Sequence, residues 1–212
     1  NESAFVVYWQ FCAPNSATKP SAKTLSVIAS NHRYQMEFKE KNIQIVLNDA
    51  LGYFNVVTVE SNPEISKFDN QNIISEFLKT KYFIWNYQNE PNGQNVILTD
   101  ENGEKREYFN EKFYGFYDTK KLEYSDFENM DFKTFEKNIE NKILKETDYA
   151  FLKRCSNVIQ KLYPKADFYL LNPPENKIPQ IVKEWPIYTF FYSYLSINKE
   201  HNEINLIEFG LD

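Results

Sequence analysis

Two runs of aromatic and β-branched residues near the C-terminus constrain the fold most strongly. They are IYTFFYSYLSI (187–197) and EINLIEF (203–209), and the polar residues NKEHN lie between them. Aromatic and β-branched side chains favour strands, and a short polar connection between two such runs is typical of a β-hairpin. The sequence therefore predicts an antiparallel sheet that contributes to a buried core.

Further runs predict additional strands. RYQMEFKE (33–40) and NIQIVL (42–47) each alternate apolar and polar residues, and the polar pair Glu40-Lys41 predicts a hairpin between them. Pro14 and Pro20 predict a loop early in the chain. By the same criteria, strands are predicted at residues 4–12, 53–60, 82–87, 95–100, 106–117 and 167–171.

Helical spacing of apolar residues occurs mainly in the middle of the chain. Asp69 or Asn70 is a suitable N-cap for a short helix, and Asp131 is suitable for a longer one. Two apolar stripes that are out of phase predict a break near Thr147-Asp148, and Pro164 ends the second helix. The first stripe holds Phe132, Phe135, Ile139 and Ile143, and the second holds Tyr149, Leu152, Cys155, Ile159 and Leu162. A last short helix is predicted at 179–185.

The order of these elements predicts an α+β fold, with a mostly antiparallel sheet built from hairpins and with helices packed on one side. Neither an internal repeat nor a Gly/Ser-rich linker divides residues 1–212, so we expect a single domain. With 42% hydrophobic and 17% aromatic residues, a chain of 212 residues can bury a substantial core.

The apolar runs are short. None approaches the ~20 residues that a membrane-spanning helix needs, so membrane insertion is not expected. The chain begins Asn1-Glu2-Ser3 without a recognisable targeting segment, which favours a cytoplasmic location. Because there is no initiator Met, a removed leader and a periplasmic or secreted location form the alternative. Cys12 and Cys155 are expected to be reduced, buried thiols, although two cysteines can form one bridge in an oxidising compartment.

Motifs for catalysis or for a cofactor are weak. Five scattered glycines cannot form a phosphate-binding loop, and there is no GxSxG motif. Ser16 and Lys19 have Ser-x-x-Lys spacing, but the partner motifs that such a serine nucleophile needs are missing. His32 and His201 fall in polar turns without metal-ligand spacing, so neither a metal nor a cofactor is expected. An enzyme would need a Cys–His pair or carboxylates that converge only in the fold.

The segment EKFYGFYDTKKLEYSDF (111–127) is the main candidate for recognition. It carries six aromatic residues and four carboxylates, and it lies within residues 100–131, which account for five of the chain's six net negative charges. Its phenylalanines and Leu122 are expected in the core, with the tyrosines at the surface beside the carboxylates. The predicted contact residues are Tyr114, Tyr117, Asp118, Glu123, Tyr124, Asp126 and Glu128.

These features predict a protein-binding function. An acidic surface repels nucleic acid and attracts a basic protein partner, and tyrosines are common at interface hot spots. We therefore expect a non-enzymatic domain, such as an inhibitor or immunity-type neutraliser of a basic protein. The sequence leaves two alternatives open: a hydrolase-type enzyme whose carboxylates or Cys–His pair assemble in the fold, and an exported domain that binds a ligand or glycan.

Overall fold

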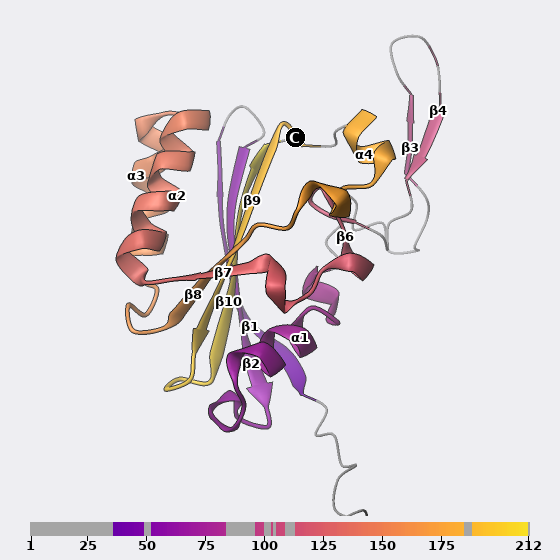
Figure 1. Ribbon diagram of the computed structural model, residues 1–212. Coiled ribbons are helices and arrows are strands. Elements are labelled where there is room, and N and C mark those ends of the chain that lie inside the picture. The colour runs from indigo at the N-terminus through magenta and orange to yellow at the C-terminus, as the bar shows by residue number, and fades with distance from the viewer. Residues whose placement is uncertain are drawn as a thin grey trace, which may run out of the picture. The chain divides into compact units, whose positions relative to one another are not determined.

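A six-stranded antiparallel sheet organises the described residues (Figure 1). The computed structural model describes residues 36–48, 52–83, 96–99, 103, 105–108, 113–184 and 188–211. The strands follow the order β1-β2-β10-β9-β8-β7, and each neighbouring pair is antiparallel. They are β1 (Glu37–Leu47), β2 (Gly52–Asn62), β7 (Phe127–Met130), β8 (Asp167–Leu171), β9 (Phe190–Asn198) and β10 (Glu203–Leu211).

The pairing of the strands confirms one predicted hairpin and corrects another. The hairpin near the C-terminus is formed by β9 and β10, whose pairing begins at Asn198 and Glu203. The hairpin predicted within residues 33–47 is wrong, because residues 37–47 form the single strand β1. The pairing of β1 with β2 shifts register between Glu40 and Asn42, so the strand accommodates Lys41 in a β-bulge where a turn was expected.

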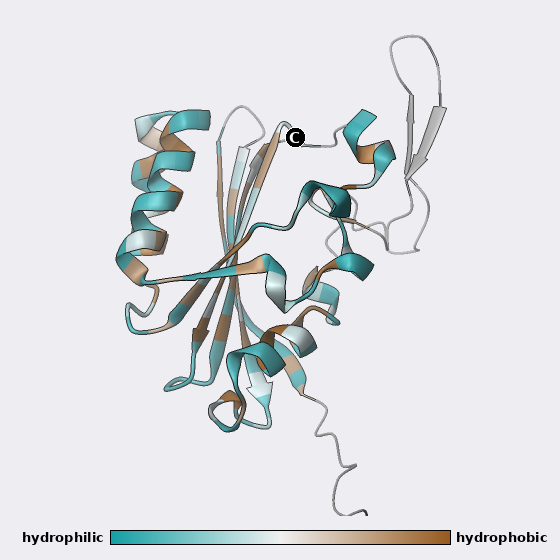
Figure 2. Cartoon of the chain, viewed as in Figure 1, coloured by the Kyte–Doolittle hydropathy of each residue, from teal (hydrophilic) through white to brown (hydrophobic). Residues whose placement is uncertain are grey.

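Helices α2 (Phe132–Glu146) and α3 (Tyr149–Ile159) cover one face of the sheet (Figure 1). Asp131 accepts a hydrogen bond from the backbone N–H of Thr134, and Asp148 accepts one from that of Phe151, both at 2.7 Å. The predicted break between two capped helices is therefore confirmed. The apolar stripes of both helices pack against Phe54, Phe168, Tyr194, Ile207 and Phe209 of the sheet, while much of their outer surface is hydrophilic (Figure 2).

Shorter elements cover the opposite face. Helix α1 (Asn70–Phe77) begins after its predicted cap, Asp69, and buries Ile73, Ile74 and Phe77. Residues 113–126 contribute to the same side of the core. The two long helices thus share one face, and α1 packs on the other. The predicted α+β class with a mostly antiparallel sheet is confirmed.

The remaining elements are short. Strands β3 (Val96–Thr99) and β4 (Lys105–Tyr108) pair with each other, and α4 (Gln180–Glu184) falls within the predicted helix at 179–185. Where a strand was predicted at 82–87, residues 81–83 form the 3-10 helix η2 (Lys81–Phe83). Within the described ranges, no helix is both long and apolar enough to cross a membrane.

Several predictions lie outside the described residues. They concern the strand at 4–12, the loop with Pro14 and Pro20, the Ser16/Lys19 spacing, and the environments of Cys12 and His32. For the same reason, a single domain over residues 1–212 stays a prediction.

Candidate functional site

Residues 113–126 form an irregular segment on the α1 side of the sheet. The continuous strand predicted over 106–117 is wrong, because the chain reverses at Gly115-Phe116. Gly115 has φ +56°, a conformation that glycine adopts at little cost and that most other residues resist. The elements of the segment are β5 (Phe113–Tyr114), β6 (Tyr117–Asp118), η3 (Thr119–Lys121) and η4 (Tyr124–Asp126), and η4 leads directly into β7.

Tyr114 is fully buried, so the prediction that its ring lies at the surface is wrong. The ring centroid lies 4.5 Å from that of Phe83 and 5.1 Å from that of Phe191. Its hydroxyl lies 2.7 Å from Ser193 Oγ and donates to Glu208 Oε1 at 2.6 Å. A tyrosine hydroxyl is expected at the rim of a core, but here partners on β9 and β10 satisfy it inside the core.

Glu208 is a buried carboxyl on β10 that joins this network to β2. Asn55 Nδ2 donates to Glu208 Oε2 at 3.2 Å, while Tyr114 donates to the other oxygen. Burial raises the pKa of Glu208 to about 7, and the two hydrogen bonds offset only part of this effect. Burial, together with the adjacent Glu208, raises the pKa of Tyr114 well above its ordinary value. Since these groups are all buried, the network anchors β5 to the sheet and does not present a contact surface.

Asp126 is also buried, so its predicted place at the surface is wrong. Lys177 Nζ lies 2.8 Å from both carboxylate oxygens of Asp126 and 3.0 Å from Oε1 of Glu123. Asp126 accepts a further hydrogen bond from the backbone N–H of Glu123, which forms a capping box at η4. Burial alone would lower the pKa of Lys177, but its bonds to the two carboxylates outweigh this effect and raise the pKa. A charged lysine therefore ties η4 to residues 175–177.

Removing this buried carboxylate should destabilise the protein. We expect Asp126→Ala to lower the free energy of unfolding by about 2 to 3 kcal/mol, because it removes the cap and leaves Lys177 with one carboxylate. Glu123→Gln is the matched comparison, since it keeps a side-chain oxygen for the capping box and loses only the ion pair of a side chain that is 66% exposed, so its loss should be much smaller. Equilibrium unfolding in urea, followed by circular dichroism, measures both variants. Equal losses would show that Asp126 does not anchor η4.

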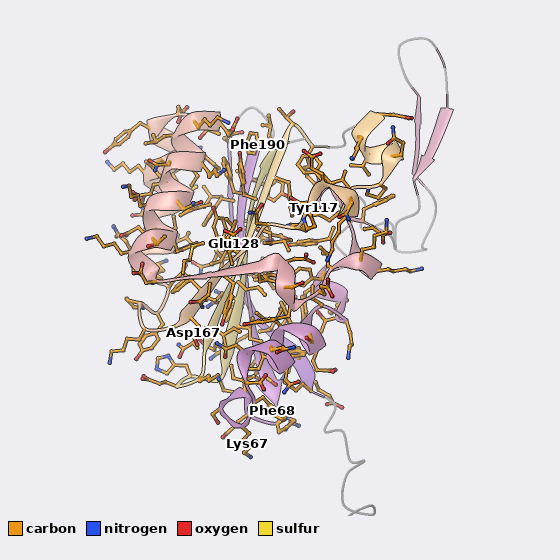
Figure 3. The ribbon with its side chains drawn as sticks, viewed as in Figure 1. Lys67, Phe68, Tyr117, Glu128, Asp167 and Phe190 are labelled. Atoms are coloured by element: carbon orange, nitrogen blue, oxygen red, sulfur yellow. The ribbon has the colours of Figure 1, made fainter. Side chains whose placement is uncertain are left out.

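The outer side of the segment keeps five of the predicted contact residues. Glu123 and Glu128 are exposed, and Tyr117, Asp118 and Tyr124 are partly exposed. Figure 3 labels Tyr117 and Glu128, which come from β6 and β7. Glu128 follows the segment and lies on the sheet face that α2 and α3 cover, whereas Tyr117 and Tyr124 pack on the α1 side. We call these five residues together the outer surface of the segment.

Local partners hold the carboxylates of this outer surface and neutralise part of their charge. Asp118 accepts a hydrogen bond from the backbone N–H of Lys120 at 3.1 Å and lies 3.8 Å from Lys121 Nζ. Glu128 accepts a hydrogen bond from Asn172 Nδ2 at 2.6 Å. The outer surface is therefore less acidic than the sequence count predicts, although its carboxylates are held in defined positions.

A groove of about 670 Å³ opens between α1 and residues 119–123. Leucines and side chains of both charges share its lining, a mixture that suits contact with side chains of another protein. Among its lining residues that the structure describes, there is no histidine that could activate the hydroxyls of Ser75 or Thr119. The groove is lined by Ser75, Leu78, Lys79, Thr119, Lys120, Leu122 and Glu123.

Cys155 and His201 do not form a catalytic Cys–His pair in the fold. Cys155 is a free cysteine in the core beneath α3, and burial raises the pKa of its thiol to about 12. A thiol that stays protonated at neutral pH is a poor nucleophile. His201 instead lies in the β9–β10 turn, where its Nδ1 is 3.0 Å from Asn198 Nδ2. Among the residues that the structure describes, no three His, Cys, Asp or Glu side chains are grouped to hold a metal ion.

Two residues that organise this region were missed by reasoning from the sequence. Glu208 follows Ile204 and Leu206 at strand spacing, so a carboxyl on an otherwise apolar face was the available signal. Lys177 lies in a proline-rich loop, and no local pattern distinguishes it from an exposed lysine.

The fold and the site together define an α+β protein with an anchored, aromatic segment across one sheet face. The chain is similar to the crystal structure of citrus MAF1 in space group C 2 2 21, with a TM-score of 0.34 and 12% sequence identity, over 77% of this chain and 90% of that chain. No family model matches the chain, and no curated protein does.

Proposed function

We propose that the protein is a non-enzymatic binding protein, and that the outer surface of the segment contacts a basic protein partner. The observation that carries the proposal is the combination of the exposed carboxylate of Glu123 with two partly exposed tyrosines, Tyr117 and Tyr124, on one anchored segment, next to the exposed Glu128 on the adjoining strand β7. Tyrosines provide contact area at interface hot spots, and carboxylates steer an approaching cation. An inhibitor or immunity-type neutraliser would use such a surface.

Pre-organisation supports the proposal. Tyr114 and Asp126 hold both ends of the segment through buried hydrogen bonds and an ion pair. A contact surface that is already ordered loses less conformational entropy when a partner binds. The groove beside α1 extends this surface with Leu78 and Leu122, which offer apolar contacts next to the charged ones.

The charge pattern sets the expected size of the electrostatic effect. Lys121 and Lys177 lie close to Asp118 and Glu123, so only part of the acidic charge is available to a partner. We therefore expect a moderate salt dependence of association, carried mainly by Glu123 and Glu128.

A test compares two variants that have the same net charge. One is Glu123→Gln/Glu128→Gln, and the matched control is Glu136→Gln/Glu140→Gln on α2, which lies outside the proposed contact surface. Each variant and the wild-type protein serve as bait in an extract of the source organism. The protein that wild type and control both retain is then purified, and its association rate is measured by stopped flow at low salt. We expect the rate constant to fall about threefold to tenfold for Glu123→Gln/Glu128→Gln alone.

Two results would contradict the proposal. One is an unchanged association rate for Glu123→Gln/Glu128→Gln with the purified partner. The other is an equal loss in the α2 control, which would show that net charge matters and the outer surface does not.

A further inference from the structure

Four neutral polar side chains form a continuous row across the face of the sheet that α2 and α3 cover elsewhere. The register pairs Asn42 of β1 with Thr58 of β2, Thr58 with Asn205 of β10, and Asn205 with Ser196 of β9. Thr58 Oγ1 donates to Asn205 Oδ1 at 2.7 Å, and Asn205 Nδ2 donates to Ser196 Oγ at 2.9 Å. We call these four residues the polar row.

The polar row interrupts an apolar face. One step along the same strands, on the same face, Val56, Tyr194 and Ile207 belong to the core beneath the helices. Asn205 is only 6% exposed and Ser196 is fully buried, and β-branched or aromatic residues are the usual occupants of such positions in a sheet. Buried polar groups cost stability unless they are hydrogen-bonded, and here the bonds along the row satisfy Thr58, Asn205 and Ser196.

One end of the polar row borders a groove of about 450 Å³. This volume is within the range of small-molecule sites. Asn42 and Gln44 line it from the edge strand β1, and Leu162, Tyr163 and Pro164 line it from the connection between α3 and β8. The wall thus combines side-chain amides with an apolar surface. An amide offers both a donor and an acceptor, as a hydroxyl group does.

The charges in the groove disfavour an anionic ligand. Lys41 Nζ lies 2.6 Å from Glu203 Oε1, so these two side chains neutralise each other. Lys161 lines the groove as well, but it is exposed. Tight recognition of a phosphate would require several charge-assisted hydrogen bonds at one place.

We infer that this groove binds a small neutral ligand rich in hydroxyl groups, namely a mono- or disaccharide. Asn42 and Gln44 hydrogen-bond its hydroxyl groups, while Asn205 supports the wall behind them and Leu162 and Pro164 contact its C–H surface. This site is separate from the outer surface of the segment and does not depend on the proposed protein-binding function.

The test is an NMR titration of the full, 15N-labelled chain. The probes are glucose, galactose, mannose and N-acetylglucosamine, each at millimolar concentrations, with inorganic phosphate as the anionic comparison. We expect at least one sugar to shift the side-chain amide signals of Asn42 and Gln44 in a saturable way. Asn42→Ala/Gln44→Ala should weaken that binding about tenfold, because it removes two hydrogen-bonding amides from the wall. Both residues lie on an edge strand and are not fully buried, so the variant should fold.

The control is Asn141→Ala/Asn157→Ala, which removes two exposed amides from α2 and α3 and should leave binding unchanged. Three results would overturn the inference. They are the absence of a saturable shift with every sugar, equal affinity in Asn42→Ala/Gln44→Ala and wild type, and saturable shifts with phosphate alone.

Discussion

Gly115→Ala should destabilise the protein by about 2 to 5 kcal/mol. At φ +56° an alanine costs about 1 to 2 kcal/mol more than glycine. In addition, a Cβ at this position would lie 2.1 Å from Cδ1 of Phe191, far inside contact distance, and overpacking of a core typically adds about 1 to 3 kcal/mol. The Phe191 ring has little freedom to move, because it packs against Tyr114 and Tyr188 at 5.1 and 5.2 Å between centroids.

Gly103→Ala separates the two contributions. Gly103 also has a positive φ, +81°, but a Cβ there would meet no atom within 4 Å. We therefore expect only the backbone cost at Gly103, and a clearly larger loss at Gly115. Equilibrium urea unfolding of both variants gives the difference. Similar losses would mean that Phe191 yields to the added Cβ and that the turn is not tightly packed.

The second large effect is a dependence of stability on pH through Glu208. The pKa of this carboxyl is about 7 in the folded protein, against an ordinary value of 4.5, so the folded state binds its proton more tightly than the unfolded state does. Its contribution is fully present below about pH 4.5 and is lost as the pH rises through 7. At 1.36 kcal/mol for each pKa unit, the loss amounts to about 3 kcal/mol at alkaline pH.

Glu208→Gln removes this titration and keeps the shape of the protonated carboxyl. We expect the unfolding free energy of wild type, taken relative to Glu208→Gln, to fall by about 2 to 3 kcal/mol between pH 5 and pH 8.5. The comparison with the variant cancels the contributions of the other carboxylates, including Glu123 and Asp131, whose lowered pKa values act in the opposite direction at acid pH. A constant difference between the two proteins across this range would show that Glu208 does not titrate in the folded state.

Elements defined by short-range interactions were predictable from the sequence. The predicted caps Asp69 and Asp131 each accept a hydrogen bond from a backbone N–H three residues further on, so the signal lies within one turn of helix. The β9–β10 hairpin follows for the same reason, because its pairing residues, Asn198 and Glu203, are joined by a short turn.

The β-bulge in β1 was not predictable in this way. Residues 33–47 contain a polar pair between two alternating runs, which fits either a turn or a bulge. The choice depends on β2, since a continuous partner strand keeps residues 37–47 extended.

The candidate site, like the fold, was predictable from the sequence only in part. Sequence composition located the segment at 111–127 and its carboxylates, and five of the seven predicted contact residues lie at least partly at the surface. The composition of the segment did not indicate that Tyr114 and Asp126 are the buried members of this set. The partners of Tyr114 are 79 and 94 residues away, and that of Asp126 is 51 residues away.

By itself, therefore, the sequence determined the helices, their caps, the C-terminal hairpin and the α+β class, because hydrogen bonds within a few residues and side-chain periodicity specify them. Only the tertiary structure decided that Tyr114 and Asp126 are buried and that four polar residues align across β1, β2, β10 and β9. Burial and cross-strand neighbours depend on contacts between segments far apart in the chain, and no local pattern encodes which distant group will satisfy a polar atom.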